Sequence, residues 1–479
     1  MNGSSTGTLT PAQAARLQQL WTLLLHLAEA SSLGALEHFV RVNSLGPTGV
    51  ISTPSPGLSR RNSLFARSET ARSRRSYEKR ASFVSTSIPF HHARLLQTFG
   101  DAGFTAAQIR SVRHFLTLMS PEDVRFGILT AAKHENPDTF VLRFLRATKW
   151  DVNQAVVQLL GTIVWRLKEM QVDNVLLPRG EAFAAASETD ISNPARAEDA
   201  RAFMKQIRIG KGFVHGVDRS NRPVLIVRIR LHRPGDQSET ALNQFITHLI
   251  ESARLVLSPP AETAVQDYSA VKFIIRCVEV YYPESVGLIL IHNAPRIFND
   301  AGVWKIIKPW IDPRLVERIH FTRSVEDLER FMDRDQIIAE LGGDEDWEYE
   351  YIEPEPDENQ AMDDLAARDT LLAERQSLGD DFIAATSHWV SSVQTGDPVQ
   401  IEEASAYRKD IIEQIRLNYW NLDPYVRARN NLDRTGVIQE GGLIEMYPIS
   451  QPQTPLAVIQ TAKVLQVEHV RGRVKVVNV

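Results

Sequence analysis

Between residues 211 and 340 the apolar pattern changes repeatedly from a period of two residues to a period of three or four, and this alternation limits the possible fold strongly. It starts with "GKGFVHGVDRSNRPVLIVRIR", which predicts a β-hairpin with "DRSN" as its turn and Arg222-Pro223 opening the second strand. Strands that alternate with helices form largely parallel sheets, because a parallel connection needs a crossover segment. The sequence therefore predicts an α/β layer. The elements expected after the hairpin are helices at about 241–257 and 269–282, a strand at 286–292, a helix at about 300–309, a strand at 316–321 and helices from 324 to 340.

The region before this layer divides into three parts. Residues 1–30 contain "LTPAQAARLQQLWTLLLHLAEA", which predicts a helix that Thr10 caps. Residues 31–88 are rich in Ser, Arg, Pro and Gly and are expected to be disordered. Residues 89–175 show helical spacing throughout, with Asp151 as the expected cap between two helices, and predict a small helical subdomain.

The disordered segment carries a basic cluster at residues 58–82, with eight Lys or Arg residues against two Glu. Such a cluster attracts an anionic membrane surface by about 1 kcal/mol per basic residue, and the alternative is a solvated segment without a partner. Ser63, Ser76 and Ser82 each follow basic residues, so phosphorylation by basophilic kinases would cancel part of this charge.

After the layer the composition becomes acidic. "DEDWEYEYIEPEPDENQAMDD" holds eleven Asp or Glu residues and no base, so residues 346–361 are expected to form a solvated linker, with contact to the basic cluster as the alternative. Residues 362–479 are predicted to be a helical extension whose end is poorly defined.

Several classes of protein are disfavoured by the sequence. The net charge of −5 argues against a chain that is basic overall, as many nucleic-acid-binding proteins are. The sequence contains no P-loop, no G-x-S-x-G, no H-E-x-x-H and no Cys/His metal-ligand spacing. We therefore expect that the protein has no metal site and is not an enzyme. Cys277 is the one cysteine and is expected to be a buried core residue in a reducing compartment. With no secretory signal and no run of about 20 apolar residues, the chain is expected to be soluble and intracellular.

Several motifs, in order along the chain, resemble the CRAL-TRIO lipid-binding family, in the branch of fungal phosphatidylinositol-transfer proteins. "VLRFLRATKWDVNQAVVQLLGTIVWR" is similar to the N-terminal helical unit of that family, and "GVDRSNRPVLIVRIRLH" to its first hairpin. "YYPESVGLILIHNAPRIFN" and "WKIIKPWIDP" resemble its most specific signature, followed by "VERIHF" and "ELGG". The resemblance spans about residues 90–345. It implies an α/β CRAL-TRIO-like fold in which residues 190–345 form a mostly parallel sheet with flanking helices that enclose a lipid cavity.

The resemblance also implies site residues. Glu284 matches a glutamate near the inositol headgroup, although a structural carboxylate at a helix end would look the same. Arg318 lies where relatives commonly carry a lysine. Thr148 lies where many relatives carry an arginine that binds the phosphate, and the neighbouring Lys149 could replace that arginine. Leu315 lies where some relatives have a hydroxyl, so preference for phosphatidylinositol is in question. The gate over the cavity and its acyl pocket would comprise Phe298, Val303, Trp304, Ile306, Ile307, Trp310 and Ile311.

One departure from the family concerns residues 258–271. "SPPAETAVQDYSAVKF" joins two expected helices directly, where relatives have an internal strand. Its loss would leave unpaired backbone groups on both neighbouring strands, at roughly 1–3 kcal/mol for each buried group. Three interpretations are open: a wrongly joined coding sequence, a splice form that cannot hold lipid, or a sheet repaired around a smaller pocket. We favour the wrongly joined coding sequence.

The resemblance thus implies a non-enzymatic protein that binds a phospholipid and exchanges it between cytosolic membrane surfaces. We expect a cytoplasmic monomer that is peripheral on membranes, with no cofactor other than the bound phospholipid and no nucleic-acid partner. The alternatives are a lipid-sensing scaffold that recruits protein partners, a variant that cannot transfer lipid because of the missing strand, or an α/β enzyme with an unrecognised site.

Overall fold

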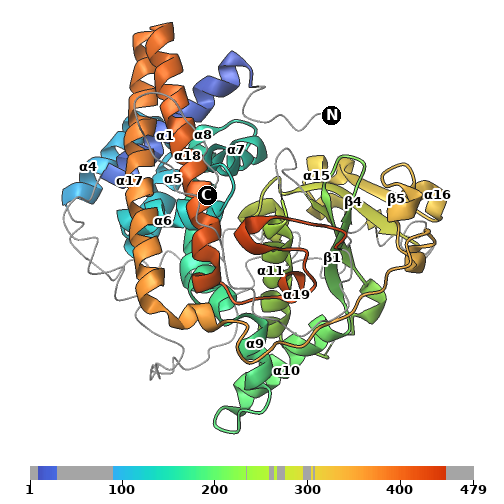
Figure 1. Cartoon of the computed structure of the whole chain (residues 1–479). Helices are drawn as coiled ribbons and strands as arrows, with labels where there is room; N and C mark the ends of the chain where they lie inside the picture. The colour runs from blue at the N-terminus through green and yellow to red at the C-terminus, as the bar shows by residue number, and fades with distance from the viewer. Residues whose placement is uncertain are drawn as a thin grey trace, which may run out of the picture.

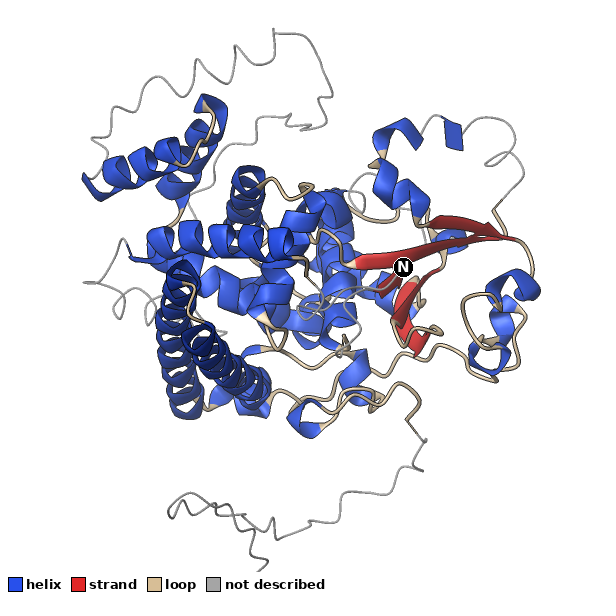
Figure 2. Ribbon diagram, turned by 90° about the horizontal axis from the view of Figure 1, so that it is seen from above, coloured by secondary structure: helices blue, strands red, loops and turns tan. Residues whose placement is uncertain are grey.

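The computed structural model describes residues 9–29, 90–233, 235–257, 264–266, 276–294, 304–305 and 308–448. Figures 1 and 2 show a large helical body on one side and the β-sheet with its own helices on the other. Several predicted features lie outside the described residues: the basic segment, the end of the chain beyond residue 448 and most of the gate helix. The predicted site residues among them are Ser63, Ser76, Ser82, Phe298, Val303, Ile306 and Ile307.

The helical body is built from three separate stretches of sequence. Its buried core combines residues of the first helix, of the 90–164 region and of two long C-terminal helices, including Trp21, Phe144 and Phe382. Asp151 caps the last helix of the middle stretch as predicted, because its side chain accepts from the Gln154 N–H at 3.0 Å. The helices are α1 (Pro11–Glu29), α4 (Phe90–Asp101), α5 (Ala106–Leu118), α6 (Pro121–Ala132), α7 (Pro137–Ala147), α8 (Val152–Val164), α17 (Leu365–Thr395) and α18 (Pro398–Val426).

One buried carboxylate joins the three stretches. Asp138, in the first turn of α7, accepts from the Trp21 indole N–H at 2.7 Å and from Arg408 Nη2 at 2.7 Å. The Arg408 guanidinium also lies over the Phe382 ring, 4.7 Å from its centroid. The predicted C-terminal extension is therefore helical, but it completes the core of the N-terminal helices.

We expect Asp138→Asn to lower the free energy of unfolding by about 1–3 kcal/mol, because the amide cannot serve the buried Arg408 as a charged acceptor. The urea midpoint measures this loss. Asp380→Asn is a matched control, since its pair with Arg125 is exposed and should matter little. Equal midpoints for the two variants would show that Asp138 does not link the stretches energetically.

The sheet has five strands in the order β1-β2-β3-β4-β5. β1 (Gly212–Val217) and β2 (Pro223–Val227) form the predicted antiparallel hairpin, in whose turn Asp218 Oδ1 accepts from Ser220 N and Arg222 N, both at 2.9 Å. The remaining pairs are parallel, which confirms the predicted layer. The other strands are β3 (Ala264–Gln266), β4 (Val286–His292) and β5 (Ile319–Thr322). The helices of this side include α9 (Leu177–Ser187), α10 (Pro194–Arg208), α11 (Glu239–Leu255), α15 (Pro313–Glu317) and α16 (Val325–Leu328).

The prediction of a missing internal strand is wrong in one respect. β3 occupies the expected position, pairing with β2 through Val224 and Val265 and with β4 from Val286 to Ile289. Its described part is three residues long, with the sequence "AVQ". Of the three interpretations of residues 258–271, this arrangement corresponds to the repaired sheet.

Two further boundaries differ from the prediction. The strand expected at 316–321 begins at Ile319, because Asp312 caps the short helix α15 that runs to Glu317. The helices expected from 324 to 340 are α16 and two 3₁₀ turns, Arg334–Gln336 and Ala339–Leu341.

The two faces of β4 pack against different apolar clusters. Ile289 and Ile291 point to one face, with Ile311, Ile319 and the partly buried Trp304. Leu288 and Leu290 point to the other, with Val224, Leu328, Met332 and Ile337. The face with Ile289 therefore offers an apolar surface beside the expected gate.

The acidic stretch is not the solvated linker that its charge predicted. Its odd-numbered residues are partly buried and its even-numbered ones exposed from 344 to 350. The Trp347 ring stacks on His215 at 3.7 Å between centroids, and Tyr349 stacks on Phe213 at 4.8 Å. Residues 345–352, hereafter the acidic strap, are thus held against β1 by aromatic side chains. Their alternation with acidic residues was the sequence signal for this packing.

Candidate functional site

A charged cluster lies where β4 and β5 begin. Glu284 precedes β4 and Arg318 precedes β5, and because the two strands are parallel neighbours, the residues before them meet at one edge of the sheet. Glu284 forms an ion pair with Arg318, whose Nη1 also donates to the Val286 carbonyl oxygen at 2.7 Å. The structure thus brings together two of the predicted headgroup residues.

A second arginine completes the cluster. Arg314 Nη1 lies 3.6 Å from Glu284 Oε1, and its Nη2 donates to the Ala147 carbonyl oxygen at 2.6 Å. That carbonyl belongs to the C-terminal end of α7, where the helix dipole favours a cation. Arg314 therefore ties the start of β5 to the helical body.

Two more carboxylates border the cluster. The hydrogen bond from Arg314 lowers the pKa of Asp312, which caps α15 by accepting from the Arg314 N–H at 2.8 Å. Glu279 Oε1 accepts from the Asp312 N–H at 2.8 Å, and burial raises the pKa of Glu279. The arginines of the cluster thus lie beside carboxylates whose pKa values are shifted in opposite directions.

These groups line a cavity of about 480 Å³ between α8 and the start of β4. Gln154, Val157 and Gln158 of α8 line one wall. Val286 and Leu315 line the cavity and also belong to the apolar cluster on the Ile289 face of β4. The cavity therefore joins a charged end to an apolar surface.

The other predicted residues lie as follows. Lys149 is exposed and is not among the residues that line the cavity, and the Thr148 hydroxyl donates to the Phe144 carbonyl oxygen at 2.9 Å. Trp304 packs edge-on against Phe321 at 5.3 Å between centroids, and Ile311 is buried. Trp310 ends the 3₁₀ turn Lys308–Trp310. Their roles with a ligand stay predictions.

Sequence reasoning missed Arg314, Asp312 and Glu279. A signal was present, because Arg314 and Arg318 are four residues apart in "DPRLVERI" and face the same side of a helical turn. Within the described residues, no group of three His, Cys, Asp or Glu side chains is placed to hold a metal ion. No helix in the same residues is long and apolar enough to cross a bilayer.

Beneath the site, a fully buried ionic network joins the helical body to α11. Glu251 of α11 accepts from Arg166 Nη1 at 2.6 Å and from the Tyr282 hydroxyl at 2.7 Å, and it forms an ion pair with Lys133 Nζ at 2.6 Å. Burial alone would raise the pKa of Glu251, but Arg166, Lys133 and Arg254 together hold it well below its usual range. The network fixes Tyr282, two residues before Glu284.

Comparisons with known proteins match two parts of the chain to family models and find relatives along most of its length. The CRAL/TRIO domain family matches residues 207–343, and the CRAL/TRIO N-terminal domain family matches residues 117–161. The chain is 33% identical over 442 residues to "CRAL-TRIO domain-containing protein C3H8.02" of Schizosaccharomyces pombe, covering 90% of this chain and 91% of that protein. It is 34% identical over 316 residues to "Phosphatidylinositol transfer protein CSR1" of Eremothecium gossypii, covering 63% of this chain and 69% of that protein.

Proposed function

This chain belongs to the CRAL-TRIO family, and on that premise we propose that it binds one phospholipid molecule and exchanges it between membrane surfaces without catalysing a reaction. The observation that carries the proposal is the cavity in which the Glu284–Arg318 pair meets the apolar face of β4. A ligand that fits both ends has a polar headgroup and hydrocarbon chains.

The charged end suits a phosphate. Arg318 donates to the Val286 carbonyl and to Glu284, and a guanidinium has five N–H groups, so donors remain for a phosphate oxygen. Glu284 can accept from headgroup hydroxyls through its second oxygen, which Arg314 approaches only to 3.6 Å. An inositol phosphate offers both partners, and the relative named as a phosphatidylinositol transfer protein supports that headgroup.

The apolar end governs the energetics of exchange. Each methylene withdrawn from water contributes about 0.8 kcal/mol, so the chains must be covered while the protein is in water. Moving the chains from a bilayer to the Ile289 face gains little, because both surroundings are apolar. Selectivity must then come from the headgroup, and the process is exchange.

The proposal is tested with native mass spectrometry followed by vesicle exchange. We expect the purified chain to carry one phospholipid and to move labelled phosphatidylinositol between phosphatidylcholine vesicles. Ile307→Asp, on the expected gate, should abolish exchange and leave the circular dichroism spectrum unchanged. A folded, lipid-free chain without exchange would contradict the proposal, and exchange by Ile307→Asp would contradict the gate.

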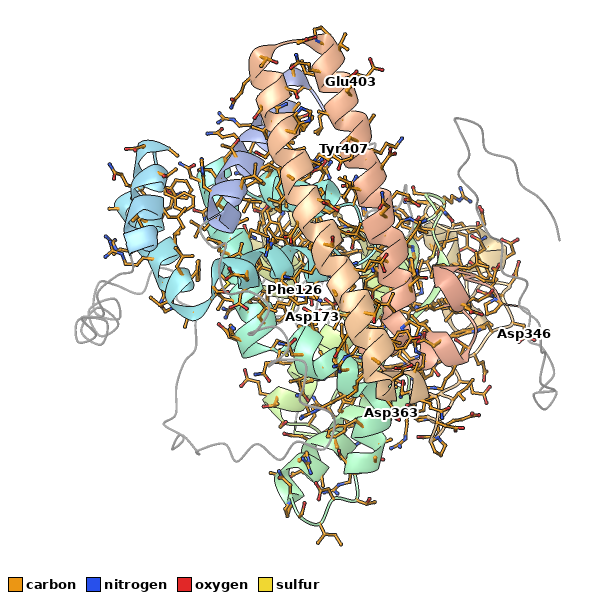
Figure 3. All side chains as sticks on the ribbon, turned by 60° about the vertical axis from the view of Figure 1, so that its left-hand side comes forward. Phe126, Asp173, Asp346, Asp363, Glu403 and Tyr407 are labelled. Carbon is orange, nitrogen blue, oxygen red and sulfur yellow. The ribbon has the colours of Figure 1, made fainter. Side chains whose placement is uncertain are left out.

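A lipid-sensing scaffold is a second candidate, and the α17–α18 hairpin favours it. In Figures 1 and 3 the end of this hairpin near Glu403 and Tyr407 extends beyond α1. Val399 is 63% exposed there and Tyr407 56%. Deleting the C-terminal region cannot separate the two functions, because Phe382 belongs to the shared core. Tyr407→Ala instead should leave exchange intact, and loss of a protein partner would favour the scaffold.

A further inference from the structure

A second cavity, of about 1270 Å³, follows the free edge of the sheet, away from the proposed headgroup site. β1 is the edge strand and pairs only with β2 among the described strands. Four consecutive residues, Gly212 to His215, line this cavity. Successive side chains of a strand point to opposite faces of the sheet. A cavity that is lined by four consecutive residues therefore touches both faces and must run along the backbone edge of the strand.

The register shows which backbone groups face the cavity. The Lys211 carbonyl accepts from Arg228 N at 2.8 Å, so this carbonyl and, two residues on, the backbone groups of Phe213 face β2. Gly212 and Val214 therefore direct their N–H and C=O groups outward. After the bulge that follows Val214, the outward N–H of Val217 donates to Tyr447 Oη at 3.2 Å. An outward row of this kind is a template for a further strand.

The two sides of the cavity differ in character. On the Val214 side lie Phe245 and Leu249 of α11, which are buried and apolar. On the other side runs the acidic strap, from which Glu345, Asp346, Glu348 and Glu350 line the cavity. An added strand would fit if its alternate side chains were apolar and basic.

The chain itself supplies such a segment. Tyr447 and Pro448 line the cavity, and residues 449–479 follow directly. These 31 residues hold four Lys or Arg against one Glu. They end in "RVKVVNV", where Arg473 and Lys475 alternate with Val474 and Val476, a pattern typical of a strand with one apolar and one charged face.

We propose that residues 473–477 bind along the edge of β1 as a sixth strand. The backbone of the segment pairs with Gly212 and Val214, the valines pack towards α11, and Arg473 and Lys475 face the acidic strap. The occupant is a segment of the same chain, because Pro448 lies in the cavity wall and the 24 residues between it and Arg473 are long enough to reach the strand edge.

Hydrogen exchange of the full chain tests the pairing. Val474→Pro/Lys475→Pro removes two consecutive N–H groups and so breaks a ladder in either register. We expect the amides of Gly212 and Val214 to exchange at least about tenfold faster in this variant than in the unmodified chain. The control Gln451→Pro/Gln453→Pro adds two prolines before the segment and should leave both rates unchanged. Equal rates in all three chains would overturn the proposal.

A disulfide trap identifies the occupant. Glu348→Cys/Lys475→Cys, oxidised at low protein concentration, should form a disulfide within one chain, and native Cys277 is buried and does not compete. A disulfide-linked dimer would show that a second copy supplies the strand, which overturns the intramolecular arrangement. Two free thiols at positions 348 and 475 would overturn it as well.

Discussion

Glu251→Ala is expected to lower the free energy of unfolding by about 3–5 kcal/mol, because removing one partner of a buried ion pair leaves an uncompensated buried charge. Glu251 is fully buried, and its removal leaves Arg166 with Asp173 and leaves Lys133 without its carboxylate. The destabilised chain should unfold at much lower urea concentration, as followed by circular dichroism.

The control for this variant is Glu413→Ala. Glu413 pairs with Arg416 on the surface of α18, with about half of its side chain exposed, and exposed pairs contribute roughly 0–1 kcal/mol. If the two alanine variants unfolded at the same urea concentration, the buried network would not hold α11 to the helical body.

Arg318→Leu is expected to slow phosphatidylinositol exchange by about 10- to 100-fold, because a hydrogen bond to a charged group contributes about 1.5–3 kcal/mol. The variant also leaves Glu284 with Arg314 at 3.6 Å as its remaining cationic partner. Initial exchange rates between vesicles, with bound lipid counted by native mass spectrometry, measure the effect.

Two further variants sharpen this test. Arg318→Lys keeps the charge and should retain more exchange than Arg318→Leu. Arg330→Leu removes an arginine whose side chain is 73% exposed and which does not line the cavity, and it should exchange lipid at the unmodified rate. A rate for Arg318→Leu equal to that of Arg330→Leu would remove Arg318 from the headgroup site.

Local signals in the sequence predicted local structure well. Asp218 and Pro223 identified the hairpin, Asp151 identified a cap, and the apolar run from Val286 identified β4 within its observed bounds. Each of these features depends on residues within a few positions of one another. The family resemblance assigned Glu284 and Arg318 to one site, and the parallel strands β4 and β5 begin at a common edge that brings the two together.

Features that depend on distant partners could not be predicted in the same way. Nothing near Asp138 indicates Trp21 or Arg408, which are 117 and 270 positions away. The acidic strap was misread because its net charge was given more weight than the alternation of Trp347 and Tyr349. The three-residue β3 was missed because a strand so short has no detectable period.

The bond between Asp138 and Arg408 also has a consequence for synthesis on the ribosome. At roughly 5–20 residues per second, the 270 residues between them take roughly 13–54 s to translate. For most of that interval α1 contacts α6, α7 and α8 but lacks α17, whose Phe382 packs edge-on against Trp21 in the finished chain. The core of the helical body is therefore completed only after α17 and α18 have been synthesised.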